Sequence, residues 1–242
     1  MRLLAIETAT AAHSVALVED GRLLAELSYE AQGNRGGMLL PTVDQVLKTA
    51  GVAARDLDAV AVSLGPGSFT GLRVGLATAQ GLALGAGAMV VGVPTLEALA
   101  EGYALADGTI CALLDAYRGE VYMALFRRNG YALERVIPDA VLAPGAVASV
   151  LAAVEGPVHL IGYGAARYRE QLEAALGGRA CVSDESLRAV PLAVVVARLG
   201  IRQFADGRTP VAEVALSYLR RAAAEMNREK GLPKSPPARV AR

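Results

Sequence analysis

Two stretches of the sequence, far apart along the chain, begin with the same order of elements. Each opens with an apolar run that ends in an acid, Glu7 in the first stretch and Asp115 in the second. Each continues with a short turn, a second apolar strand, an Asx-Gly hairpin and a third strand, with Gly21 and Gly130 as the hairpin glycines. An internal repeat of this kind predicts two structurally related halves.

Helical periodicity and single apolar strands follow both repeats. The sequence therefore predicts an α/β fold with two related halves, each a mixed sheet flanked by helices. We expect an N-terminal half at residues 1–104 and a C-terminal half at residues 105–220. Beyond them the chain becomes polar and rich in proline, which predicts a flexible tail at residues 221–242.

The segment Gly65–Gly85 predicts a glycine-cornered turn and then a helix capped by Ser68. Glycines inside a helix each cost about 1 kcal/mol relative to alanine, so a compensating contact is expected. Gly71, Gly75 and Ala79 recur every four residues, which favours close packing of a second helix on their face. A phosphate cradle at the turn is the alternative, but the lysine of a P-loop is absent from the segment.

Composition argues against several classes of protein. Basic and acidic residues balance at 24 each, so no global field attracts nucleic acid or a membrane. The two cysteines, Cys111 and Cys181, lie in apolar runs and are expected to be reduced. Neither a secretory leader nor an apolar run long enough to span a membrane is recognisable, so we expect a cytoplasmic location.

The repeated opening resembles the superfamily of actin, sugar kinases and heat-shock ATPases, and thus implies the actin-like (ribonuclease H-like) fold. In active members the two strand-end acids serve magnesium and phosphates between the halves. Ala9 stands where the kinase-type turn has glycine, and its Cβ would crowd a phosphate. We therefore expect Glu7, Thr8 and Asp115 to form a vestigial nucleotide cleft.

The chain also resembles the TsaB family, on motifs that run from the first strand to Arg220. They include Ala5–Thr10, Gly65–Gly75 and Asp115–Tyr122. The resemblance implies a non-catalytic accessory subunit that binds TsaD, with TsaE as a second partner and tRNA contacted only through the complex. A homodimer is expected when the chain is alone. The predicted contact residues are Leu39, Val43, Val46, Gly71, Leu72, Gly75, Leu76, Ala79 and Gln80.

The resemblance also implies what this chain lacks. The catalytic relative TsaD carries a His-x-x-x-His metal pair, and Thr95 and Leu99 stand in its place here. We expect neither a metal nor a cofactor, and no peptidase activity.

Two rival functions remain open. A small-molecule kinase or ATPase would need a glycine-rich phosphate turn. A direct tRNA-binding module would need stacking aromatics, yet the C-terminal basic residues have only Tyr218 nearby. Those basic residues are Arg220, Arg221, Arg228, Lys230 and Lys234.

Overall fold

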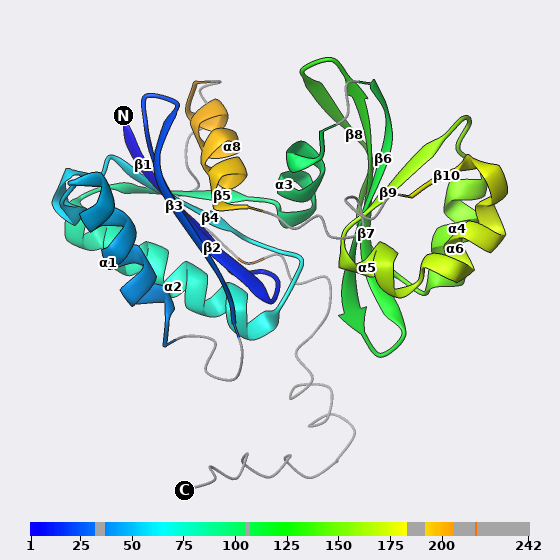
Figure 1. Cartoon of the computed structure of the whole chain (residues 1–242), viewed down its shortest axis with the longest axis horizontal. Helices are drawn as coiled ribbons and strands as arrows, with labels where there is room; N and C mark the ends of the chain where they lie inside the picture. The colour runs from blue at the N-terminus through cyan, green and yellow to red at the C-terminus, as the bar shows by residue number, and fades with distance from the viewer. Residues whose placement is uncertain (32–36, 105–106, 183–191, 206–215, 217–242) are drawn as a thin grey trace, which may run out of the picture.

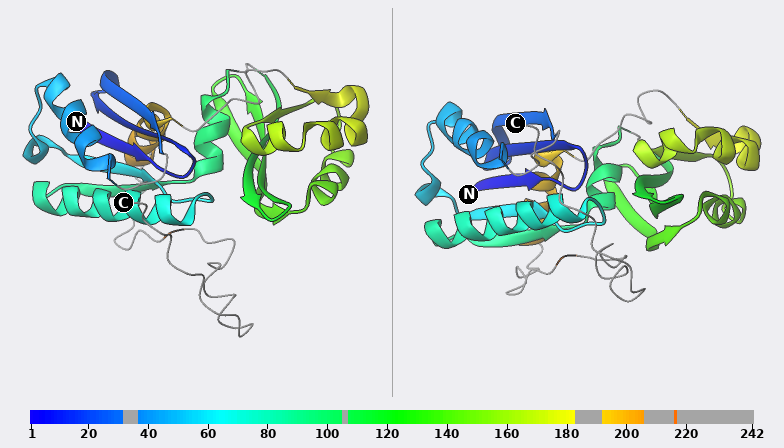
Figure 2. Two further views of the ribbon diagram at one scale, coloured as in Figure 1. Left: turned by 60° about the horizontal axis from the view of Figure 1, so that its bottom comes forward. Right: turned by 90° about the horizontal axis from the view of Figure 1, so that it is seen from below.

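A computed structural model describes residues 1–31, 37–104, 107–182, 192–205 and 216. The two halves lie side by side, with one short helix at their junction (Figure 2). The predicted tail at residues 221–242 and the basic cluster at residues 220–234 lie outside the described residues.

The N-terminal sheet has five strands in the order β3-β2-β1-β4-β5. β1, β2 and β3 form an antiparallel meander, and β4 and β5 add parallel to β1. Helices α1 and α2 cover one face of this sheet, and the short helix η1 precedes β4 (Figure 1). The bounds are β1 Arg2–Glu7, β2 Ala12–Glu19, β3 Arg22–Glu30, α1 Leu39–Ala50, η1 Ala54–Asp56, β4 Ala59–Ser63, α2 Phe69–Ala86 and β5 Met89–Val93.

The C-terminal sheet repeats this topology in the order β10-β9-β6-β7-β8. Its first three strands again form an antiparallel meander, and β9 and β10 add parallel to β6. The prediction of two related halves, each with a mixed sheet, is confirmed. The bounds are β6 Asp107–Tyr117, β7 Glu120–Asn129, β8 Ala132–Leu142, α4 Pro144–Ala152, β9 Val158–Ile161, α5 Tyr163–Arg167, α6 Arg169–Leu176, η2 Gly177–Arg179 and β10 Ala180–Cys181.

Two helices are exchanged between the halves. Helix α3, Thr95–Gly102, packs Leu96, Leu99 and Ala100 on the C-terminal sheet, whereas Ala98 is buried in the N-terminal cluster. Its carboxylates also reach strand arginines of that sheet, because Glu97 pairs with Arg135 at 3.0 Å. The predicted boundary after residue 104 therefore places α3 in the wrong half, since chain order does not decide which sheet a helix covers.

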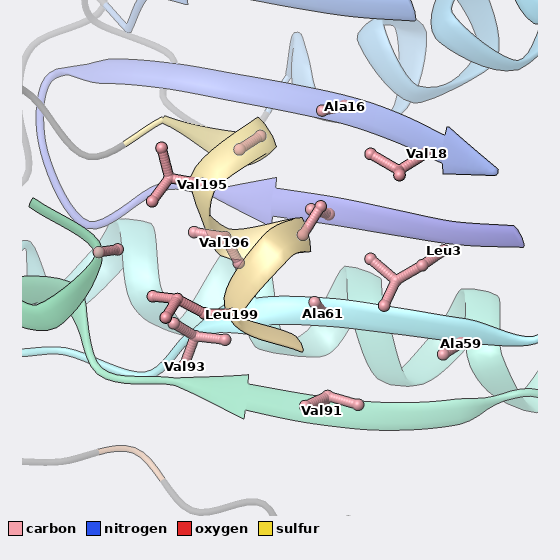
Figure 3. Packing of buried hydrophobic residues seen from close by; sticks show 14 residues of the cluster. Leu3, Ala16, Val18, Ala59, Ala61, Val91, Val93, Val195, Val196 and Leu199 are labelled. Atoms are coloured by element: carbon pink, nitrogen blue, oxygen red, sulfur yellow. The ribbon is translucent and has the colours of Figure 1, made fainter. Parts of the chain in front are cut away.

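Helix α8, Ala193–Ala205, makes the reciprocal exchange. Its side chains at Val195, Val196 and Leu199 are buried against the N-terminal sheet, on the face opposite α1 and α2 (Figure 3). A Cβ added at Gly200 would lie 3.1 Å from the Cβ of Ala61, so helix and sheet approach closely there. The predicted C-terminal half at residues 105–220 therefore includes a helix that belongs to the N-terminal core.

Polar groups of the N-terminal sheet also hold the first turn of α8. The Ala193 amide donates to Ser14 Oγ at 2.9 Å, and the Val194 amide donates to a carboxylate oxygen of Glu26 at 3.1 Å. These acceptors satisfy two of the amides that a helix leaves unbonded at its start. They tie α8 to β2 and β3.

Candidate functional site

Two glycines of α2, Gly71 and Gly75, and Gly67 of the turn before it lie against the turn that follows β1. A Cβ at Gly71 would overlap the Thr8 carbonyl oxygen, and a Cβ at Gly75 would overlap Thr8 Oγ1. Thr8 Oγ1 donates to the Gly71 carbonyl at 2.9 Å. The predicted cap is present, because the Gly71 amide donates to Ser68 Oγ at 3.2 Å. The small-residue face thus fits the chain's own β1 turn rather than a second protein.

Most of the predicted partner contacts are therefore wrong as surface contacts. Seven of the nine are buried in the N-terminal half, because α1 and α2 direct their apolar stripes at the sheet. Of the other two, Leu76 is half-buried and Gln80 is exposed. The seven buried residues are Leu39, Val43, Val46, Gly71, Leu72, Gly75 and Ala79.

The outward face of α2 is poor in charge and includes several small or apolar residues. Its exposed residues recur at helical spacing, and Leu84 is 87% exposed. Arg73 is the one charged residue in the 18-residue helix, and its guanidinium carbon lies 3.8 Å from the centre of the Phe69 ring. The exposed residues of this face are Thr70, Arg73, Ala77, Gln80, Gly81, Leu84 and Gly85.

The start of α1 exposes further apolar side chains. Met38 is 55% exposed and Leu40 is 59% exposed. We call the α2 face above, together with Met38 and Leu40, the charge-poor surface. The sequence signal for it was the near absence of charge from α2, since a solvent-facing helix ordinarily carries charges on its outer side.

The first acid of the predicted cleft is enclosed. Glu7 is fully buried, its carboxylate accepts from the Ala9 amide at 2.6 Å, and it also accepts from the Ser63 hydroxyl. Burial raises the pKa of Glu7 to about 7, although the bonds from Ser63 and Ala9 oppose that rise. The Ser68 amide donates to the Ala9 carbonyl at 2.6 Å, so the start of α2 packs on the turn at which the resemblance would place a phosphate.

The second acid is bonded inside the other half. Asp115 Oδ2 accepts from the guanidinium of Arg167 at 2.9 Å, and Asp115 Oδ1 accepts from the Tyr117 amide at 3.0 Å. Tyr117 and Arg118 both have positive φ, at 60° and 56°, in the hairpin that follows. Within the described residues, Glu7 and Asp115 are each bonded only in their own half. These residues do not fit a magnesium-nucleotide site.

Thr95 and Leu99, which stand at the positions of the metal-binding histidines, are both buried in the core. Thr95 Oγ1 accepts from the Gly65 amide at 3.1 Å, and Thr95 is fully buried. Leu99 is 1% exposed, and a Cβ at Gly162 would lie 2.9 Å from its Cδ2. In the described ranges, no three His, Cys, Asp or Glu side chains come together as a metal-binding group. Thr95 and Leu99 do not fit a metal centre, and the structure uses them to hold α3.

The described helices include none that is both long and apolar enough to cross a membrane.

Comparison with known proteins identifies related sequences. The profile of the family described as TsaD, tRNA N6-adenosine threonylcarbamoyltransferase, matches residues 30–231. The Bacillus subtilis tRNA threonylcarbamoyladenosine biosynthesis protein TsaB is 31% identical over 177 residues, which cover 73% of this chain and 77% of that protein. The Escherichia coli protein of the same name is 46% identical over 133 residues, which cover 53% of this chain and 56% of that protein. The match thus spans little more than half the length of the Escherichia coli relative.

A solved structure agrees with the fold. A Pseudomonas aeruginosa protein described as similar to peptidase YEAZ has a TM-score of 0.79 and 30% identity, and the match covers 90% of this chain and 99% of that chain. The predicted fold, two halves of the actin-like ATPase type, is confirmed.

Proposed function

Since the chain belongs to the TsaB family of tRNA threonylcarbamoyladenosine biosynthesis proteins, we propose that it is the accessory subunit that activates TsaD. TsaD would transfer the threonylcarbamoyl group to the adenosine next to the tRNA anticodon. This chain would contribute no reacting group to that step. It would act in the cytoplasm, with TsaE as a further partner and with tRNA bound only through the complex.

One observation supports the proposal: the chain's own groups enclose Glu7 and Thr95, two of the positions at which the resemblance would place catalytic groups. The carboxylate of Glu7 is enclosed by Ser63 and the Ala9 amide, and Thr95 caps the Gly65 turn. A site of this kind offers neither an open acid for magnesium nor a metal ligand pair. The same geometry argues against a kinase or ATPase, and against the peptidase activity mentioned in the name of one relative.

The charge-poor surface is the proposed binding site for TsaD and, when TsaD is absent, for a second copy of this chain. The large apolar side chains of Leu84, Met38 and Leu40 are exposed to solvent in the isolated chain. Burial of such side chains is favourable at about 25 cal/mol per Å² of apolar area, so a partner that covers them gains affinity. The small residues Ala77 and Gly81 allow a partner helix to approach closely. TsaD and the second copy should therefore compete.

An activator of this type works through different affinities for two states of its partner. If the chain binds the competent conformation of TsaD more tightly than the idle one, binding shifts TsaD toward the competent state. A preference of about 1.4 kcal/mol is enough for tenfold activation when the competent state is rare. Residues of the charge-poor surface should therefore control activity, although none of them contacts the substrate.

Leu84→Glu is expected to weaken both self-association and TsaD binding at least tenfold, about 1.4 kcal/mol, because it places a charge in an apolar contact. At concentrations where the wild-type chain is monomeric, its melting temperature should stay the same, since Leu84 is 87% exposed in the monomer. Analytical ultracentrifugation measures both associations. Leu23→Glu, at a 44% exposed position on β3, is the matched control and should leave them unchanged. Normal association of the Leu84 variant would overturn the interface assignment.

The functional test is a reconstituted transfer assay with TsaD, TsaE and tRNA. The chain should raise modification, Leu84→Glu should lose that effect, and Glu7→Gln should keep it. Hydrolysis of ATP by the isolated chain that Glu7→Gln abolishes would refute the accessory role and favour the kinase alternative.

A further inference from the structure

Helix α3 is attached to the N-terminal half at its first residue. The Thr95 amide donates to the Gly65 carbonyl at 2.9 Å, and the Gly65 amide donates back to Thr95 Oγ1 at 3.1 Å. Gly65 lies in the turn between β4 and α2 of the N-terminal half. Because α3 itself packs on the C-terminal sheet, this pair of bonds joins the two halves at one point.

A second attachment lies in the last turn of α3. One carboxylate oxygen of Glu101 accepts from Arg128 of β7 at 3.0 Å, and the other accepts from Arg202 of α8 at 2.6 Å. Arg128 belongs to the C-terminal sheet, whereas α8 is buried in the N-terminal core. Glu101 therefore links the two halves. It lies roughly 9 Å from Thr95 along the helix axis, at a rise of about 1.5 Å per residue.

The two arginines that hold Glu101 differ in exposure. The Arg128 side chain is 9% exposed and also donates to the Ala100 carbonyl at 3.0 Å, whereas Arg202 is 52% exposed. If Arg202 departs, Glu101 keeps Arg128, and water solvates the released guanidinium. Opening the outer pair thus leaves no buried charge without a partner, which is the costly outcome when an ion pair breaks.

We propose that the ion pair between Glu101 and Arg202 is a latch that fixes the angle between the two halves, with the Thr95–Gly65 bonds as its pivot. While the latch is closed, α3 is held at both ends and the halves keep one orientation. When it opens, the hydrogen bonds that join α3 to the described residues of the N-terminal half remain only at the pivot. Ala98 of α3 is still buried in the N-terminal cluster, and a Cβ at Gly102 would lie 3.4 Å from Val195 Cγ2 of α8. These contacts are apolar and have no fixed direction, so they permit sliding.

The latch makes the angle between the halves sensitive to salt, because ions screen an exposed pair. Where TsaD binds the charge-poor surface of the N-terminal half, the latch would set the position of the C-terminal half in the complex. This last consequence rests on the proposed function. The proposal that the latch fixes the angle between the halves does not depend on that function.

The experiment measures the distance between the halves by double electron-electron resonance. Spin labels are attached at Arg55→Cys in the N-terminal half and Tyr131→Cys in the C-terminal half, which are exposed by 85% and 97%. Cys181 is changed to serine, and the fully buried Cys111 is left in place. Labelled protein is diluted with unlabelled protein so that only distances within one chain contribute.

Arg202→Gln is expected to broaden the distance distribution roughly twofold or to add a second population. High salt should do the same to the wild-type chain. Arg202→Lys should restore the narrow distribution, since a single nitrogen of Arg202 carries the pair. Arg198→Gln, at another exposed arginine of α8, is the control and should leave the distribution narrow.

A narrow distribution in Arg202→Gln would overturn the latch. So would equal broadening in the lysine variant or in the Arg198 control, because the effect would then not depend on charge at position 202. A transfer assay with TsaD separates the two proposals. If the wild-type chain fails to activate TsaD, the proposed function fails, whereas the distance measurement still decides on the latch.

Discussion

Gly71→Ala is expected to lower the free energy of unfolding by about 3 kcal/mol or more, which corresponds to roughly 10 °C in melting temperature. The added Cβ would overlap the Thr8 carbonyl oxygen, which is backbone and has no side-chain rotation by which to move away. The start of α2 would have to retreat and would lose the bond from Thr8 Oγ1 to the Gly71 carbonyl. Urea unfolding followed by circular dichroism measures the change.

Gly81→Ala is the matched control on the same helix. Nothing lies within 4 Å of a Cβ at Gly81, and the position is exposed. Alanine there removes the helix penalty of glycine, so stability should rise by about 1 kcal/mol. Should the two substitutions shift stability in the same direction, the close contact between α2 and the β1 turn is not what requires glycine.

Glu7→Gln is expected to stabilise the protein by about 3 kcal/mol at about pH 8, a rare direction for a buried substitution. Burial raises the pKa of the Glu7 carboxyl from 4.5 to about 7. The unfolded chain therefore loses this proton above pH 4.5, while the folded chain keeps it until about pH 7. The wild type consequently loses stability as the pH rises between these values, and the penalty is fully present above pH 7.

The glutamine side chain has the size of protonated glutamate and, like it, carries no charge. Its carbonyl oxygen can accept from the Ala9 amide, and its amide group can donate to Ser63 Oγ, so the variant keeps the contacts of Glu7. Unfolding measured from about pH 4 to about pH 8 should show a gap between the two proteins that opens as the pH rises. Glu30→Gln, at an exposed acid of β3, is the matched control for the substitution itself. A variant that is less stable than wild type at high pH would mean that Glu7 is ionised and needed as an anion.

The sequence predicts the strands of this fold better than its assembly. The repeated acid-ended strands and hairpins are local patterns, and both sheets follow them. Residues 163–176 form two short helices, α5 and α6, because the chain turns at Tyr168, where φ is −115°. Neither glycine nor proline marks that turn. Which sheet α3 and α8 cover depends on contacts with strands that are far away in the sequence. No local sequence pattern predicts such contacts.

The orientation of α2 could not be predicted for a different reason. The outer face of this helix carries one charge, Arg73, and two other polar residues, while its remaining exposed residues are as small or apolar as those of the inner face. Periodicity separates the two faces clearly only when polar residues dominate one of them. The sequence analysis proposed α2 as a partner helix, and Gln80 does lie outside, but most of the α2 residues that it named lie on the inner face. The outer residues Ala77 and Leu84 required the structure.

The exchange of α8 has a consequence for how the chain is made. The face of the N-terminal sheet formed by Leu3, Ala61 and Val91 is covered by residues 193–205, which a ribosome synthesises after nearly all of the C-terminal half. Until residues 193–205 are synthesised, the N-terminal half therefore exposes an apolar sheet face to water. Nascent chains in such a state aggregate or recruit chaperones. The halves repeat one topology, but neither can complete its folding alone, and translation must pass through both before the first one is closed.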